Sequence, residues 1–199
     1  HFNLIDLFNK NKNKKIKKYI DSIANNINRS KPIPINVDEN IIFRAQYGGG
    51  NGFEFFKNIS LRENIKKIIS KKLTLLKKDY LCIHVRNTDI KCDYKSLYMN
   101  NKDYIHSFNE IYICTDDKLV YDFFKSKLKN AVCFTTFPHI YNKNLHNSNI
   151  PSNIKMIDLL TDIFVATNSK SIISYSKGGF IKFLRNCHKN KKYVLNMLS

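Results

Sequence analysis

The residue types that could do chemistry gather first in residues 84–89 (HVRNTD). This segment follows residues 80–83 (YLCI), an apolar run that is typical of a strand buried on both faces. Ligands of open α/β sheets bind outside the carboxyl ends of the strands, so His84, Arg86 and Asp89 would stand where a ligand binds. The alternative is a polar strand end that meets solvent, with Thr88 or Asp89 capping the next helix.

Two other apolar runs also end in polar residues. These are residues 110–114, which precede Asp116 and Asp117, and residues 171–173, which precede Ser174 and Ser176. Because the carboxyl ends of parallel strands meet at one edge of a sheet, we expect the three polar ends to form one site. Asp116 and Asp117 have an alternative role as a helix cap, and Ser176 has one as a turn residue.

The last of these strand ends continues through Lys177 and two glycines into a helix that we expect to begin at Phe180. The start of a helix binds phosphate well, because its N–H groups are unsatisfied and its dipole is positive there. Arg86 facing this turn would complete a pyrophosphate site, since guanidinium matches phosphate oxygens with two hydrogen bonds. Asp162, one helix earlier, could reach the same edge and accept hydrogen bonds from a base such as guanine.

Alternating apolar runs and helical patterns must position these residues. Strands are predicted near 80–86, 110–115, 131–135 and 171–174, with another at 41–43. Helical spacing of apolar residues predicts helices over 60–76, 118–128 and 154–166, the first begun by a capping box at Ser60 and Glu63. This alternation predicts an α/β fold with a Rossmann-like parallel sheet flanked by helices.

The residues before the first of the four strands suggest less chemistry. Residues 1–30 are predicted to form one or two short helices joined by a solvated turn, and residues 31–34 (KPIP) an extended linker. The glycine cluster at 48–52 has no phosphate-loop spacing. It is either a flexible loop or a place where the backbone approaches a ligand closely.

The composition favours an acidic partner but not nucleic acid. The 34 Lys and Arg residues exceed the 16 Asp and Glu residues, which gives a formal charge of +18 over 199 residues. Heavy use of Asn, Lys and Ile is typical of an AT-rich genome, so much of this charge is expected on solvated faces. A nucleic-acid binder would interleave basic residues with exposed aromatics, whereas the aromatics here lie in apolar runs.

The cysteines and the hydropathy pattern give expectations about the cellular compartment of the protein and about membrane segments. Five cysteines form no CxxC pair and no metal-ligand spacing. An odd count without a disulfide framework favours a reducing compartment such as the cytoplasm. No apolar stretch has membrane-spanning length and no signal-peptide pattern is present, so we expect no transmembrane segment.

Three segments resemble the motifs of the fucosyltransferase superfamily, which includes α1,2-, α1,6-, nodulation and protein O-fucosyltransferases. Residues 84–89 resemble its His-x-Arg-x-x-Asp motif, and residues 111–117 (IYICTDD) resemble its second motif. Residues 162–176 resemble the third, an Asp-bearing helix followed by a strand and a Ser turn. The three occur in family order at family-like spacing, over roughly residues 40–190.

The resemblance implies a role for each residue. Arg86 would bind the β-phosphate of GDP-fucose and stabilise the departing diphosphate, while His84 and Asp162 would contact the guanosine. Ser176 would hydrogen-bond the pyrophosphate from a turn that also brings Ser174 and Lys177 to the substrate. Asp116 and Asp117 would brace the site, with Asp117 closer to the nucleotide.

The resemblance also implies a GT-B-like enzyme that inverts the sugar without a metal or other cofactor and transfers it to a glycan or protein hydroxyl. Its general base would be Asp93, with Asp89 as the alternative. Residues 37–199 would be the nucleotide-sugar-binding domain, and residues 1–36 the tail of an acceptor-side half. Because His1 is not an initiator Met, the chain is expected to begin inside a longer precursor, and the acceptor-side half is expected to be truncated or reduced.

Two departures from the family keep a second hypothesis open. Many α1,6-type members have a second Arg where this chain has Asn87, and the Gly-rich start of an acceptor-side half is not visible. A non-catalytic module that binds a GDP-sugar or a glycan would also fit these features.

Overall fold

The computed structural model describes residues 19–21, 41–43, 52–88, 90–138, 145 and 148–199. The chain divides into two compact units, 1–51 and 52–199, which we describe separately. In the first unit, β1 (Tyr19–Asp21) and β2 (Ile41–Phe43) pair in parallel. The strand at 41–43 was predicted correctly. The helical prediction is wrong at 19–21, where an aromatic and a β-branched residue pair with β2 instead.

The second unit is built on a four-stranded parallel sheet with the order β5-β4-β3-β6. Its strands are β3 (Leu81–Val85), β4 (Ile111–Thr115), β5 (Ala131–Val132) and β6 (Ser171–Ile173). All four predicted runs therefore form strands, and every neighbouring pair is parallel. The predicted α/β class, a Rossmann-like parallel sheet flanked by helices, is confirmed.

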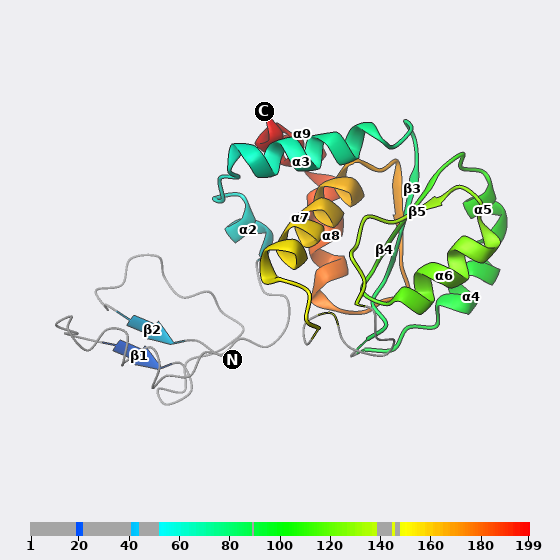
Figure 1. The fold of residues 1–199 in the computed structure, drawn as a ribbon, viewed down its shortest axis with the longest axis horizontal. Coiled ribbons are helices and arrows are strands. Elements are labelled where there is room, and N and C mark those ends of the chain that lie inside the picture. Colours follow the sequence, from blue (N-terminus) through cyan, green and yellow to red (C-terminus); the bar gives the residue numbers. More distant parts are fainter. Residues whose placement is uncertain (1–18, 22–40, 44–51, 89, 139–144, 146–147) are drawn as a thin grey trace. The chain divides into compact units, whose positions relative to one another are not determined.

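Helices cover both faces of this sheet (Figure 1). One face carries α2 (Gly52–Phe56), α3 (Glu63–Thr74), α7 (Ser152–Asn168), α8 (Gly179–Lys189), α9 (Lys191–Leu195) and the short 3₁₀ helix η2 (Asn196–Leu198). The other carries α4 (Tyr94–Asn100), α5 (Lys102–His106) and α6 (Lys118–Lys127). The predicted helices thus exist, although several begin or end a few residues from the predicted positions.

Strand side chains alternate between the two faces and create two hydrophobic cores. Tyr80, Cys82, Tyr112 and Cys114 pack on the side of α3, α7, α8 and α9. Leu81, Ile83, Val85, Ile111 and Ile113 pack on the side of α4, α5 and α6. His84 lies on the first face, next to α8, because it continues the alternation of Tyr80 and Cys82.

Two element boundaries differ from the prediction. Strand β5 stops at Val132, and farther along the same segment the backbone N–H of Thr136 bonds to the Asp158 carboxylate of α7, 2.8 Å away. The predicted capping box is wrong, since Arg62 is the N-cap of α3 and makes no side-chain cap bond. The Glu63 carboxylate pairs with Lys66 at 2.9 Å instead of returning to the backbone.

We expect Phe164→Ala to lower the free energy of unfolding by about 3–5 kcal/mol. The Phe164 ring is fully buried and packs on the Phe56 ring at a centroid distance of 6.1 Å, so truncation leaves a cavity. Urea unfolding followed by circular dichroism measures the change. Met156→Ala on the same helix is the control, because Met156 is 55% exposed and its loss should cost less than about 0.5 kcal/mol.

Candidate functional site

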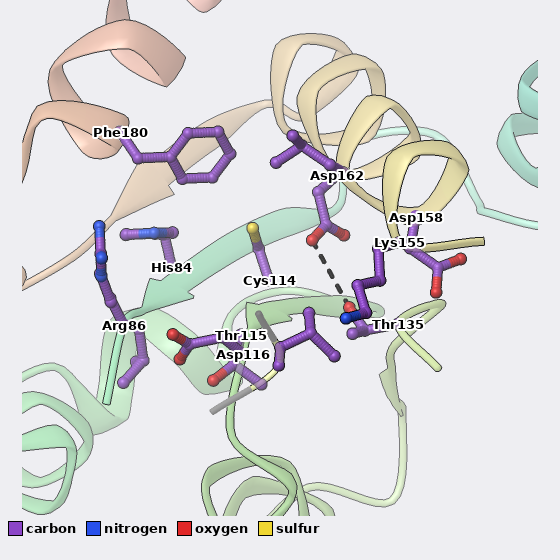
Figure 2. Close-up of a pocket in the computed structure, with 13 residues that line it drawn as sticks. His84, Arg86, Cys114, Thr115, Asp116, Thr135, Lys155, Asp158, Asp162 and Phe180 are labelled. Atoms are coloured by element: carbon purple, nitrogen blue, oxygen red, sulfur yellow. Dashed lines mark hydrogen bonds between the residues drawn. The ribbon is translucent and has the colours of Figure 1, made fainter. Parts of the chain in front are cut away.

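A cavity of about 280 Å³ lies at the carboxyl ends of β3 and β4. Four of the residues predicted from the sequence line it: His84, Arg86, Asp116 and Asp162. They come from the end of β3, the end of β4 and the middle of α7 (Figure 2). The strand order explains this meeting, because β3 lies between β4 and β6 and all three strands run in the same direction.

Two serine hydroxyls tie the end of β3 to the turn after β6. Ser174 Oγ lies 3.0 Å from His84 Nδ1, and Ser176 Oγ accepts the backbone N–H of Arg86 at 3.0 Å. Ser174 Oγ also accepts the backbone N–H of Ser176 at 3.1 Å. These bonds extend the pairing of Ile83 with Ile173 beyond the strands, so the positions of His84 and Arg86 depend on the serine turn.

His84 is neutral at physiological pH. Burial lowers the pKa of this imidazole to about 4, and the nearby positive charges of Arg86 and Arg185 add to the effect. Its ring lies 5.5 Å from the Phe180 ring and only 3% of the residue is exposed. A neutral imidazole in this wall can position a ligand by a hydrogen bond or by packing, without adding charge.

Arg86 lines the cavity together with Phe180 of the first turn of α8, and its backbone N–H bonds Ser176 in the turn that leads into this helix. Figure 2 shows its side chain on the same side of the cavity as His84 and Phe180. The N-cap of α8 is Gly178, which gives no side-chain bond to the N–H groups of the first turn. A Cβ at Gly178 would meet no atom within 4 Å, so the space at this position is open. A guanidinium and an uncapped helix start can together bind an anion.

The two aspartates after β4 brace the loop that follows Arg86. Asp116 accepts the backbone N–H of Asn87 at 2.9 Å and the Thr88 hydroxyl at 2.6 Å. Asp117 caps α6 through the N–H of Leu119 and accepts the Asn87 amide at 2.8 Å. Asp116 is among the residues that line the cavity and Asp117 is not.

Asn87, the position where many α1,6-type enzymes have Arg, has a structural role. Besides its bond to Asp117, its side-chain oxygen accepts the backbone N–H of Cys92 at 3.1 Å. Only 8% of the residue is exposed. Its amide therefore holds the loop together rather than facing the cavity.

Asp162 is a buried carboxyl group in the cavity wall. It accepts a short hydrogen bond from the Tyr112 hydroxyl, and the Thr135 hydroxyl lies 3.5 Å from its second oxygen. Burial raises its pKa to about 7, and the negative charge of Asp158 adds to the rise. Hydrogen bonds with Tyr112 and Cys114 and the charge of Lys72 act on this pKa in the opposite direction. A carboxyl group poised near neutrality in a cavity is typical of functional sites.

Five described residues that were predicted for the site are not among those that line the cavity: Asp93, Asp117, Ser174, Ser176 and Lys177. Asp93 is exposed and caps α4 by accepting the backbone N–H of Ser96 at 3.0 Å, and this bond lowers its pKa. Lys177 is exposed on the serine turn. Asp89 lies outside the described residues. Of the two candidates for the general base, Asp93 thus acts locally as a helix cap.

Sequence reasoning missed four further polar or aromatic residues of the cavity. These are Thr135, Lys155, Asp158 and Phe180. Lys155 and Asp158 lie seven and four residues before Asp162 in turns of the same helix, so helical spacing from Asp162 could have indicated both. Thr135 carries no such signal, because its position depends on where β5 leaves the sheet.

Among the residues that the structure describes, no group of three or more His, Cys, Asp and Glu side chains is placed to hold a metal ion. None of the described helices is both long and apolar enough to cross a membrane. All five cysteines are free thiols, and Cys82, Cys114 and Cys187 are buried.

The sheet order and the two helical layers define a Rossmann-like α/β unit with a fucosyltransferase-like fold. Solved structures of the α1,6-fucosyltransferase NodZ are similar to it. They include NodZ soaked with GDP-fucose (TM-score 0.51, 15% identity), NodZ co-crystallised with GDP (0.50, 16%) and NodZ from Bradyrhizobium (0.50, 15%). At this identity the similarity establishes the fold alone.

Each of these alignments covers 77% of this chain and 53% of the NodZ chain, so this chain matches about half of NodZ. No protein-family model matches the sequence, and a search of curated proteins finds no match.

We expect Asp162→Asn to stabilise the protein at high pH. With a folded pKa of about 7 against an ordinary value of 3.8, the folded state holds a proton that the unfolded state has lost between these pH values. Stability therefore falls as the pH rises through 7, by up to about 4 kcal/mol. The variant should match the wild type near pH 4 and exceed it by up to that amount at pH 8.

Urea unfolding of both proteins at several pH values measures this difference. His84 titrates in the opposite sense, because its neutral folded form loses stability as the pH falls from 6.5 towards 4. That contribution is common to both proteins and cancels in the comparison. A difference that stays constant between pH 4 and 8 would contradict the prediction.

Proposed function

We propose that this chain is the donor-binding half of an inverting, metal-independent glycosyltransferase that moves fucose from GDP-fucose to a hydroxyl of a glycan or protein. The observation that carries the proposal is the placement of Arg86. It lies at the carboxyl end of a buried strand and lines the cavity together with Phe180, a residue of the first turn of α8, whose N-cap Gly178 makes no side-chain bond. The fold similarity to a fucosyltransferase solved with GDP and with GDP-fucose supports the choice of donor.

The chemistry assigned to Arg86 is stabilisation of the leaving group. The acceptor oxygen attacks the anomeric carbon, the bond from that carbon to the β-phosphate oxygen breaks, and GDP leaves with the bonding electrons. Negative charge then grows on the β-phosphate. A guanidinium and the dipole of α8, both fixed before the reaction, stabilise that charge without reorganisation.

The nucleoside end of the donor is assigned to His84 and Asp162. The Asp162 oxygen that faces Thr135 lies 3.5 Å from its hydroxyl, and a carboxylate oxygen has two lone pairs, so it can accept a further hydrogen bond from the N–H groups of guanine. Ser174, Ser176 and Lys177 belong to the proposed pyrophosphate turn. The two hydroxyls are engaged with β3, so their main contribution is to hold His84 and Arg86.

The acceptor proton requires a general base, and Asp93 and Asp89 remain the proposed candidates. Asp93 lies outside the cavity lining and caps α4 in this structure. This observation favours a second candidate function, a module that binds a GDP-sugar without turning it over. The structural role of Asn87 also favours this second function, because the Asn87 side chain provides no second cation for the phosphates.

We expect GDP to bind in the presence of EDTA, and more tightly than ADP or UDP. Arg86 and the start of α8 would supply the positive charge for the diphosphate, and Asp162 would supply the preference for guanine. Isothermal titration calorimetry with each nucleotide, with EDTA and with Mg²⁺, measures both effects. Equal affinity for the three nucleotides would remove the guanine assignment, and binding that needs Mg²⁺ would remove the metal-independent one.

We expect Arg86→Lys to weaken GDP binding at least about tenfold. Turnover of GDP-fucose should fall about a hundredfold, which corresponds to a loss of roughly 3 kcal/mol of transition-state stabilisation. Lysine keeps the charge but lacks the planar pair of donors that matches a phosphate. Calorimetry and thermal melting separate this role from a structural one. Arg185→Lys, an exposed position on α8, is the matched control and should leave GDP affinity unchanged. A lower melting temperature with normal GDP affinity would identify Arg86 as a structural ion-pair partner.

A further inference from the structure

Helix α7 presents three charged side chains to the cavity. Lys155, Asp158 and Asp162 all line it, and their spacing of three and four residues puts them on one face of the helix. Figure 2 shows them on this helix above the end of β4, with Lys155 and Asp158 on the side of the cavity away from Arg86. The cavity thus has two cationic ends, Arg86 after β3 and Lys155 on α7.

The two carboxylates on this face of α7 are already held by the protein. Asp158 accepts the backbone N–H of Thr136 at 2.8 Å and lies 3.6 Å from the Lys72 ammonium. Asp162 is bonded by Tyr112 and approached by Thr135. Fixed acceptors of this kind can recognise the N–H groups of a base, because the carboxylates do not have to reorganise when the base binds.

The Lys155 ammonium is anchored at the cavity wall. It donates to the backbone carbonyl of Ser148 at 2.9 Å, and the residue is only partly exposed. An ammonium carries three N–H donors, so a bond to Ser148 is compatible with a bond to a ligand. Anchoring reduces the side-chain entropy that Lys155 would lose on binding.

The edge of guanine carries an acceptor, O6, beside the donors N1–H and N2–H. Adenine carries an amino donor in place of O6. A cation on the same helix face as a buried carboxylate therefore matches the hydrogen-bonding edge of guanine. It disfavours adenine, because the ammonium and the adenine amino group are both donors and would meet at position 6. Lysine donating to O6 is a common way of recognising guanine.

We propose that Lys155 is a specificity-determining residue that donates a hydrogen bond to O6 of a guanine whose N–H groups bind Asp162. The inference rests on the proposed GDP site and adds a residue that neither the motifs nor the resemblance indicated. It places the base on α7 and the diphosphate at Arg86, at opposite ends of the cavity. Loss of the O6 contact should weaken binding about ten- to a hundredfold.

The test compares GDP, 6-thioguanosine diphosphate and ADP by calorimetry. The thio analogue keeps both sets of N–H donors and replaces O6 with a sulfur, which accepts hydrogen bonds weakly. The wild type should prefer GDP over the thio analogue by about tenfold or more. In Lys155→Met this preference should fall to near unity, because the donor to position 6 is gone, while binding of the thio analogue changes little.

Two further variants serve as controls for this test. Lys155→Arg retains a cationic donor and should keep most of the preference for GDP over the thio analogue. Lys170→Met removes the same charge from an exposed position next to the opposite end of β6, so it should change neither affinity. Thermal melting of each variant identifies any loss of folding.

Several results would overturn the inference. Equal weakening of all three nucleotides in Lys155→Met would assign Lys155 to the phosphates or to the structure of the wall, and no change would remove it from the site. A wild-type protein that binds GDP and ADP equally would overturn only the base assignment. A wild-type protein that binds none of the three would instead overturn the proposed function, and the inference with it.

Discussion

The parallel pairing of β3 with β4 on one side and β6 on the other determines where every polar group of the cavity lies. Cys114 and Thr115 are opposite His84 and Val85, so Asp116 comes next to the residues after β3. The register with β6 continues in the bonds from Ser174 to His84 and from Ser176 to Arg86. A shift of one residue would turn His84 towards α6 and remove the imidazole from the cavity.

Burial of charge is the second constraint on this site. The protein keeps Asp158 and Asp162 on a helix face that is otherwise packed against the sheet, and it does so with hydrogen bonds from Thr136 and Tyr112. Removing a carboxylate from water costs free energy unless it is paired. The raised pKa of Asp162 shows that its partners compensate this cost incompletely. Retaining such a group is reasonable where binding a ligand requires a fixed acceptor.

Much of the fold could be predicted from the sequence, and the site only in part. The apolar runs identified the four strands, and their shared direction brought Arg86, Asp116 and Asp162 together. Local hydrogen bonding could not be predicted in the same way. In the sequence, Asp93 is an acidic residue that follows the motif at 84–89. In the structure, its spacing to Ser96 makes it a helix cap. Thr135 lies beyond the end of β5, in a segment that is bonded to α7 across the fold.

The long sequence separation between β3 and β6 has a consequence for folding. Strands β3, β4 and β5 with α4, α5 and α6 form one contiguous stretch of chain, whereas the partners His84 and Ser174 are 90 residues apart. Contacts between distant residues form slowly, because a large loop must close first. We expect the contiguous stretch to fold early and the serine turn to dock late. The arrangement of His84 and Arg86 on the serine turn would then be complete only in molecules that have finished folding.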